Sequence, residues 1–305
     1  MVTGRAAWIW MCVAVGGLVG PTRAQASECE TPPVGMACIP GGTFIIGTEA
    51  NIHPDCDQAS SQKRNRSNTV GTHTVILDTY FMDLTEVTNE AYRACIDAGK
   101  CPREGPNYRD FRRPMQPVTG VSWFAAVAFC NAQGKHLPTE AEWEAAVRGP
   151  NGHLYPWDGA SATCENAVIR DPERGRSCGV KKLGGSPRTG RVLQVGSRPA
   201  GRYGLFDMIG NAEEWTADWY SNDWKECGRS CEGRNPRGPC DGAIKCKGKR
   251  FRTVRGGSWY WPAEHGTGVH RRPQRPNNKP FHHFGFRCAA SLDEGRRLAV
   301  PNQGR

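Results

Sequence analysis

The chain has 305 residues and carries 40 Lys and Arg against 30 Asp and Glu, which gives a formal net charge of +10. This excess favours acidic partners or anionic surfaces. The sequence has no helix-turn-helix, zinc-finger or RNA-binding signature, which argues against specific nucleic-acid binding. The length fits one large domain or two modest ones.

Residues 1–26 have the features of a signal peptide. Arg5 supplies the positive region, residues 6–20 form the apolar run, and Ala24-Gln25-Ala26 is an A-x-A cleavage site. The run is shorter than the about 20 apolar residues of a membrane span, and no later stretch is apolar enough to cross a bilayer. We therefore expect an exported protein, periplasmic or extracellular. Loss of Arg5 and Arg23 would leave a net charge of 38 − 30 = +8.

Cysteine usage agrees with export, because removing Cys12 with the signal peptide leaves 14 − 1 = 13 cysteines. Most are expected in disulfides, and Cys95 and Cys101 bracket the end of a predicted helix, where they would close a small loop. The other cysteines assigned to disulfides on this ground are Cys164, Cys178, Cys227, Cys231, Cys240 and Cys246. The last four would alternatively form a zinc site, and their pairing stays open. The odd count leaves one cysteine over, for which Cys56 is the candidate.

The many glycines and prolines, 37 and 22, predict frequent turns and few long elements. Residues 36–47 are predicted to form two short strands around a Pro-Gly-Gly turn, and residues 73–83 one strand. A helix is then expected from Thr88, its N-cap, through Ala98, with Gly99 as the stop signal.

Two further helices follow. Ser122 is expected to cap the first, which Gly134 ends. Thr139 and Glu142 form a capping box for the second, predicted from Glu140 to about Arg148. The acids of its first turn are assigned to the helix dipole and not to acid–base catalysis.

The closing part of the chain begins at residues 255–259, with a last strand predicted over residues 284–288. Residues 292–305 are predicted to be a charged, disordered tail.

Among the carboxylates of residues 203–215, Asp207 and Glu214 lie on either side of a Gly-Asn pair. Calcium takes carboxylate and carbonyl oxygens from tight loops, and the backbone carbonyls of Gly210 and Ala212 would complete such a set. The alternative is an ordinary turn, because Gly-Asn pairs often mark turns that bind nothing.

Eight motifs, taken together in this order, resemble the formylglycine-generating enzyme (sulfatase-modifying factor) superfamily. They lie at residues 39–44, 86–89, 118–123, 134–144, 155–157, 203–215, 255–259 and 285–287. The resemblance implies an α+β fold: one compact mixed domain over residues 27–291, related to C-type lectins and poor in regular secondary structure.

The resemblance also implies site residues. Asp207, Gly210, Ala212 and Glu214 match the family's ligands for a structural calcium ion. A second calcium site of the family would begin at Asn166, although no later Asp completes it convincingly. The family's helix-to-strand disulfide would join Cys130 to Cys288.

One departure decides the expected function. The family's enzymes bind copper(I) through two cysteines, a choice that suits this soft ion. The matching positions here are Trp261 and Gly266, and Glu213 replaces a Trp common in catalytic members. We therefore expect neither copper nor formylglycine formation, and no catalytic residue is assigned.

Two functions remain open. A divergent oxidoreductase would use a histidine cluster, His265, His270, His282 and His283, to bind iron. However, the relatives with such chemistry take their ligands from a helical domain that is absent here. The favoured function is a module that binds an extended peptide, a protein or an anionic glycan.

The groove proposed for this module is lined by aromatic side chains and rimmed by arginines. Its main members are Ser258, Trp259, Trp261, Arg255 and Arg271, with Trp219, Tyr220, Trp224, Tyr260, Arg252, Arg272 and Arg275 around them. The alternative for the tryptophans is the protein core, which is expected for about half of them.

Overall fold

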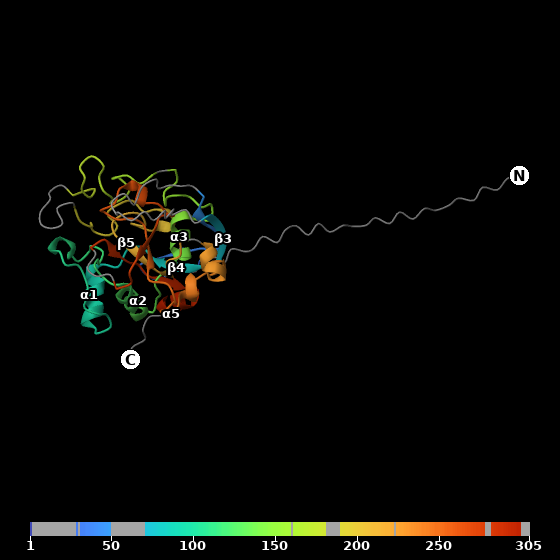
Figure 1. Cartoon of the computed structure of the whole chain (residues 1–305), viewed down its shortest axis with the longest axis horizontal. Coiled ribbons are helices and arrows are strands. Elements are labelled where there is room, and N and C mark those ends of the chain that lie inside the picture. Colours follow the sequence, from blue (N-terminus) through green and yellow to red (C-terminus); the bar gives the residue numbers. More distant parts are fainter. Residues whose placement is uncertain are drawn as a thin grey trace.

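The computed structural model (Figure 1) describes residues 1, 29, 31–49, 71–159, 161–180, 190–222, 224–277 and 282–299. The predicted signal peptide, apart from Met1, lies outside these residues, as do Cys12 and Cys56. Within them, no helix is long and apolar enough to cross a membrane.

Within these described residues, ten short strands form three small sheets. The first has the order β1 (Met36–Ile39), β4 (Tyr80–Asp83), β10 (Ala289–Ser291); the second β2 (Gly42–Thr48), β3 (Gly71–Leu77), β6 (Gly233–Arg234); the third β8 (Arg271–Gln274), β7 (Arg252–Arg255), β5 (Glu213–Trp219), β9 (Phe284–Gly285). The β3–β6 and β5–β9 pairs are parallel and the others antiparallel. Every sheet combines distant parts of the chain, so none forms from local sequence alone.

The prediction of one strand over residues 73–83 was wrong, because the chain changes sheets within it. β3 ends at Leu77 and β4 starts at Tyr80 in another sheet. Thr79 lies buried at the corner, where its hydroxyl accepts a hydrogen bond from Gly41 N at 2.9 Å. The two strands predicted within residues 36–47 are present, and they too belong to different sheets.

The three helices predicted in the first half are confirmed. They are α1 (Asn89–Asp97), α2 (Trp123–Ala132) and α3 (Glu140–Arg148), and the Thr88, Ser122 and Thr139 side chains cap them as expected. A short α4 (Trp224–Cys227) and several 3-10 turns complete the central part. The turns are Arg109–Phe111, Arg202–Gly204, Gly228–Cys231, Pro239–Gly242 and Ala263–His265.

The C-terminal end departs from the prediction in two ways. The strand expected over residues 284–288 is only β9, and the chain pairs again in β10. The expected disordered tail is instead helical over α5 (Leu292–Ala299). α5 packs on β4 so closely that a Cβ at Gly295 would lie 2.2 Å from the Phe81 ring. Residues 300–305 lie outside the described part.

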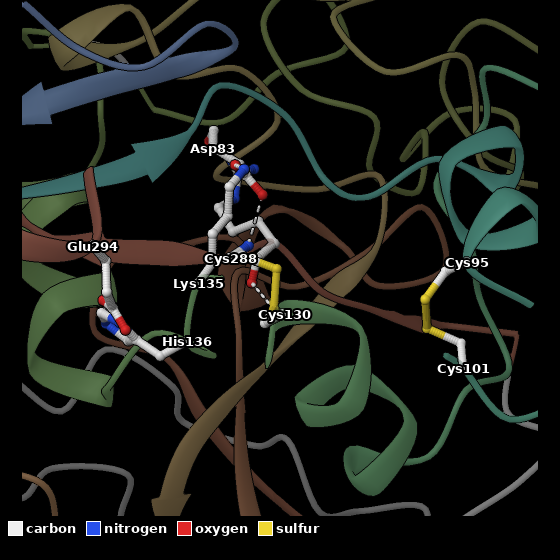
Figure 2. The surroundings of a disulfide bond; sticks show 9 residues. Asp83, Cys95, Cys101, Cys130, Lys135, His136, Cys288 and Glu294 are labelled. Atoms are coloured by element: carbon white, nitrogen blue, oxygen red, sulfur yellow. Dashed lines mark hydrogen bonds and ion pairs between the residues drawn. A yellow bond between two sulfur atoms is a disulfide. The ribbon is translucent and has the colours of Figure 1, made fainter. Parts of the chain in front are cut away.

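Disulfides stabilise this fold, and they include the two pairs expected beforehand, Cys95–Cys101 from the sequence and Cys130–Cys288 from the resemblance. The other cysteines assigned to disulfides pair as Cys164–Cys178, Cys227–Cys231 and Cys240–Cys246, which settles the pairing left open among the last four, and Cys29–Cys38 is an additional pair. Cys130–Cys288 joins α2 to the segment before β10, beside the Asp83–Lys135 ion pair (Figure 2). A mixed α+β domain with little regular structure is therefore confirmed, and its disulfides suit an exported or lumenal protein.

Candidate functional site

Arg255 and Arg271 are core residues, and the expectation that they rim a groove was wrong. Both guanidinium groups are buried and paired with acids of α3. Arg255 Nη2 lies 2.5 Å from Glu144 Oε2, and Arg271 Nε lies 2.5 Å from Glu140 Oε1. Burial alone would raise the pKa of Glu140, but Arg271 outweighs it and lowers this pKa. The acids of α3 therefore neutralise buried arginines in addition to interacting with the helix dipole at the start of α3.

Other members of the proposed groove are also internal. Arg252 is buried between the rings of Trp123 and Trp219, 3.7 Å from each centroid. Ser258 and Trp259 are fully buried as well. A side chain without solvent contact cannot touch a soluble ligand, so these residues are removed from the binding surface.

Trp261 and Arg272 remain partly exposed and form the centre of the candidate site. The Trp261 ring has two close neighbours: the His265 ring, stacked at 4.9 Å, and the Arg272 guanidinium, 4.6 Å from its centroid. A cation over a Trp face is attracted by the ring quadrupole. The pair therefore offers an aromatic face beside a positive charge.

Glu213 holds Arg272 in this position. Arg272 Nη1 donates to both oxygens of the buried Glu213 carboxylate, at 2.5 and 2.6 Å. Burial raises the pKa of Glu213, and Arg272 opposes this effect. Sequence reasoning noted Glu213 only as a replacement for Trp and did not foresee the ion pair, because β5 and β8 come together only in the folded sheet.

Gly266, the other position of interest, has no space for a larger residue without local adjustment. A Cβ there would lie 2.8 Å from Ile209 Cγ2. Neither Trp261 nor Gly266 offers a metal ligand from its side chain. The space beside Gly266 is thus occupied by the Ile209 side chain.

The predicted histidine cluster comes together only in part. His265 and His270 have ring centroids 4.9 Å apart, while His283 contacts Trp259 and Tyr260. Burial lowers the pKa of His283 to about 2, helped by His282 and Arg272, so its ring is neutral at ordinary pH. Among the described residues, no three His, Cys, Asp or Glu side chains are grouped closely enough to hold a metal ion.

Three buried carboxylates lie around Arg287: Asp207 and Glu214, which belong to residues 203–215, and Glu86. Glu214 receives hydrogen bonds of 2.7–2.9 Å from Arg287, and Asp207 Oδ2 accepts one of 2.6 Å from Gly196 N. Glu86, which the sequence analysis did not assign to this site, accepts from Ala212 N at 3.3 Å through Oε1, and its other oxygen receives no hydrogen bond from a donor group of the described residues.

The carboxylate cluster carries more negative charge than Arg287 neutralises. Burial, together with Asp207 and Glu214, raises the pKa of Glu86 well above its usual range. Burial likewise raises the pKa of Asp207 to about 6, against the opposing effect of Gly196 N. A site of this kind is stabilised either by protons or by a cation with oxygen ligands. The chemistry of these residues therefore suits a hard ion.

Asn166 forms a local turn. Its side-chain oxygen accepts a hydrogen bond from Thr163 N at 2.7 Å, and its amide nitrogen donates to Ser161 O at 2.9 Å. Both polar ends of the side chain are thus used by neighbouring backbone.

Comparison with known proteins gives the same assignment as the motifs. Residues 22–292 match the family described as the sulfatase-modifying factor enzyme 1-like domain. The chain belongs to this family.

Among its relatives, the formylglycine-generating enzyme of Thermomonospora curvata is 31% identical over 304 residues, 84% of this chain and 93% of that protein. The serine/threonine-protein kinase pkn1 of Chlamydia pneumoniae is 32% identical over 297 residues, 89% of this chain but only 40% of the kinase. Of solved structures, PvdO from Pseudomonas aeruginosa matches with a TM-score of 0.61 and 21% identity, over 84% of this chain and 94% of PvdO, which supports the shared fold.

This member of the sulfatase-modifying factor family has no free thiolate among the residues that the structure describes. The twelve cysteines there all form disulfides. A disulfide sulfur is not the soft thiolate that copper(I) prefers. The one available signal for Glu86 was its place in a family motif at residues 86–89, which sequence reasoning used for the resemblance but not for the site.

Proposed function

We propose that this protein is a divergent family member that binds an extended peptide or an anionic polymer and does not oxidise cysteine to formylglycine. The observation that carries the proposal is the replacement of both copper-ligand positions. Trp261 stands at the first and is stacked on His265, while Gly266 stands at the second and is closely packed against Ile209.

The proposed ligand surface is Trp261 with Arg272. Both side chains keep some solvent contact, whereas Arg255 and Arg271, which the sequence also placed on this surface, are buried. The aromatic face suits an apolar or peptide group, and the guanidinium suits a carboxylate or sulfate. Glu213 fixes the guanidinium, which lowers the entropy cost of ordering it on binding.

The experiment compares the wild type with Trp261→Ala. Titration with heparin and with a poly-glutamate peptide is followed by calorimetry, and thermal unfolding is measured in parallel. Loss of a stacked aromatic contact is expected to weaken binding about tenfold while the melting temperature stays nearly unchanged. Phe124→Ala is the control, because Phe124 is an aromatic residue that is 47% exposed and lies on α2, which contributes neither Trp261 nor Arg272.

Three outcomes would contradict the proposal. One is a large loss of stability in Trp261→Ala, which would make Trp261 a core residue. Another is unchanged affinity for both probes. A third is stoichiometric copper in the purified protein together with turnover of a sulfatase-derived cysteine peptide.

A divergent oxidoreductase is the second candidate, and the observation in its favour is the His265–His270 contact next to Trp261. Iron content of the purified protein distinguishes the two. Stoichiometric iron that is lost in His265→Ala would support the oxidoreductase.

We further propose that the carboxylate cluster holds a structural calcium ion. Asp207, Glu214 and Glu86 would supply side-chain oxygens, and the carbonyls of Gly210 and Ala212 would supply backbone oxygens. The excess of buried carboxylates over Arg287 supports this assignment. The ion would stabilise the fold by removing that charge imbalance. Export through the N-terminal signal peptide belongs to the same proposal, and the disulfides support it.

A further inference from the structure

A short basic loop lies in the disulfide-rich part of the chain. Residues 240–250 contain four basic side chains and one acid, a net charge of 4 − 1 = +3. Lys245, Lys247 and Arg250 are exposed. Within the described part of the chain, these three cations have no acidic partner within ion-pair distance. Their charge is therefore available to an external partner.

The loop also presents an apolar side chain. Ile244 is 64% exposed, more than Ile76 at 43% or Phe124 at 47%. Its neighbour Ala243 is exposed as well. Single exposed apolar residues are common on protein surfaces, but this one lies directly beside Lys245.

The fold holds the backbone beneath Ile244 in place. Trp219 Nε1 donates to Ala243 O at 2.7 Å, and Arg252 Nη2 donates to the carbonyls of Ala243 and Ile244, both at 3.2 Å. Arg252 is itself clamped between two Trp rings. The Cys240–Cys246 disulfide closes the loop from the other side. Ile244 is exposed because its backbone is anchored to the core, and not because the loop lacks contacts.

We propose that this loop docks the protein on an anionic lipid membrane. Ile244 would enter the boundary between headgroups and acyl chains, and Lys245, Lys247 and Arg250 would contact the anionic headgroups. Apolar area and basic charge together are what peripheral membrane binding requires. A soluble polyanion would satisfy the charges but would give no role to an exposed isoleucine, so the lipid surface is the better match.

The test is co-sedimentation with vesicles. Vesicles of phosphatidylcholine with phosphatidylglycerol are compared with vesicles of phosphatidylcholine alone, at low and at physiological salt. We expect binding to the anionic vesicles only, weakened by salt. Ile244→Ser is expected to weaken it about tenfold through the loss of partly buried apolar area. The double variant Lys245→Ala, Lys247→Ala is expected to weaken it about 25-fold, since each cation contributes about fivefold.

Ile76→Ser is the matched control, because it removes an exposed isoleucine from β3 and is expected to leave vesicle binding unchanged. Trp261→Ala is likewise expected to bind vesicles normally, which separates this inference from the proposed ligand surface. Failure to sediment with anionic vesicles would overturn the proposal. Full binding by Ile244→Ser, with equal retention on heparin, would also overturn it and assign the loop to soluble polyanions.

Discussion

Replacing Arg255 by Met is expected to destabilise the fold strongly, because it breaks the centre of the buried ion network. Arg255 is fully buried, pairs with Glu144 Oε2 at 2.5 Å and lies 3.4 Å from Glu140 Oε1. It also donates to the carbonyls of Gly268, Val269 and His270, at 2.7, 3.3 and 3.1 Å. Methionine keeps much of the volume but none of these contacts.

The magnitude follows from what the substitution leaves behind. Removing one partner of a buried ion pair costs about 3–5 kcal/mol. Glu144 would keep the hydrogen bonds donated by Arg148 Nη1, at 2.6 Å, and by Gly47 N, at 2.7 Å, so its buried charge would still be paired. The three carbonyls would each lose a donor, at about 1 kcal/mol or more. A net loss of about 3–5 kcal/mol corresponds to a fall in melting temperature of about 6–20 °C.

Urea unfolding followed by tryptophan fluorescence is the assay. Arg250→Met is the matched control, because Arg250 is exposed and its loss is expected to change stability by no more than about 0.5 kcal/mol. A loss below about 1 kcal/mol for Arg255→Met would refute the reasoning. Weaker ligand binding at unchanged stability would instead restore Arg255 to a binding surface.

The remaining predictions concern pH and calcium. Burial alone would lower the pKa of His136, but Glu142 and Glu294 raise it to about 10, and His136 in turn helps to lower the pKa of Glu294 to about 2 against the effect of burial. The stability from His136 is therefore complete below pH 6.5 and lost as pH rises through about 10, and that from Glu294 is present above pH 4.5 and lost as pH falls through about 2. His136→Ala is expected to lose about 1–2 kcal/mol of stability relative to the wild type, after screening. The resulting difference in melting temperature should be widest between pH 4.5 and 6.5. A difference that does not vary with pH would contradict the assignment. Calcium added to chelator-treated protein should raise the melting temperature, because calcium at a hundredfold excess over Kd adds about 2.7 kcal/mol of stability. Asp207→Ala and Glu86→Gln should each reduce this response. Equal melting curves with and without chelator would refute the site.

Local sequence signals were sufficient for α1, α2 and α3 and for the Cys95–Cys101 loop, but not for α5, which was expected to be disordered. The caps at Thr88, Ser122 and Thr139 act within one helical turn, so they do not depend on the rest of the fold. The Cys95–Cys101 loop is also local, whereas the Cys130–Cys288 bridge required the family resemblance because its cysteines are 158 residues apart. The same resemblance identified Trp261 and Gly266 as the positions at which the family's copper-binding cysteines are replaced.

Burial and pairing between distant segments were decided only by the tertiary structure. Sequence patterns treat an arginine as a surface residue, because an unpaired charge is too costly to bury. Arg255 and Arg271 are internal because the acids of α3 face them across the core. The residues 73–83 show no strand break in their pattern, since the corner at Thr79 depends on Gly41. What could be read without the structure was the family, the starts of α1, α2 and α3, and the presence of Trp and Gly at positions 261 and 266. Which charged and aromatic side chains reach solvent depended on contacts between segments far apart in the chain, which no local pattern encodes.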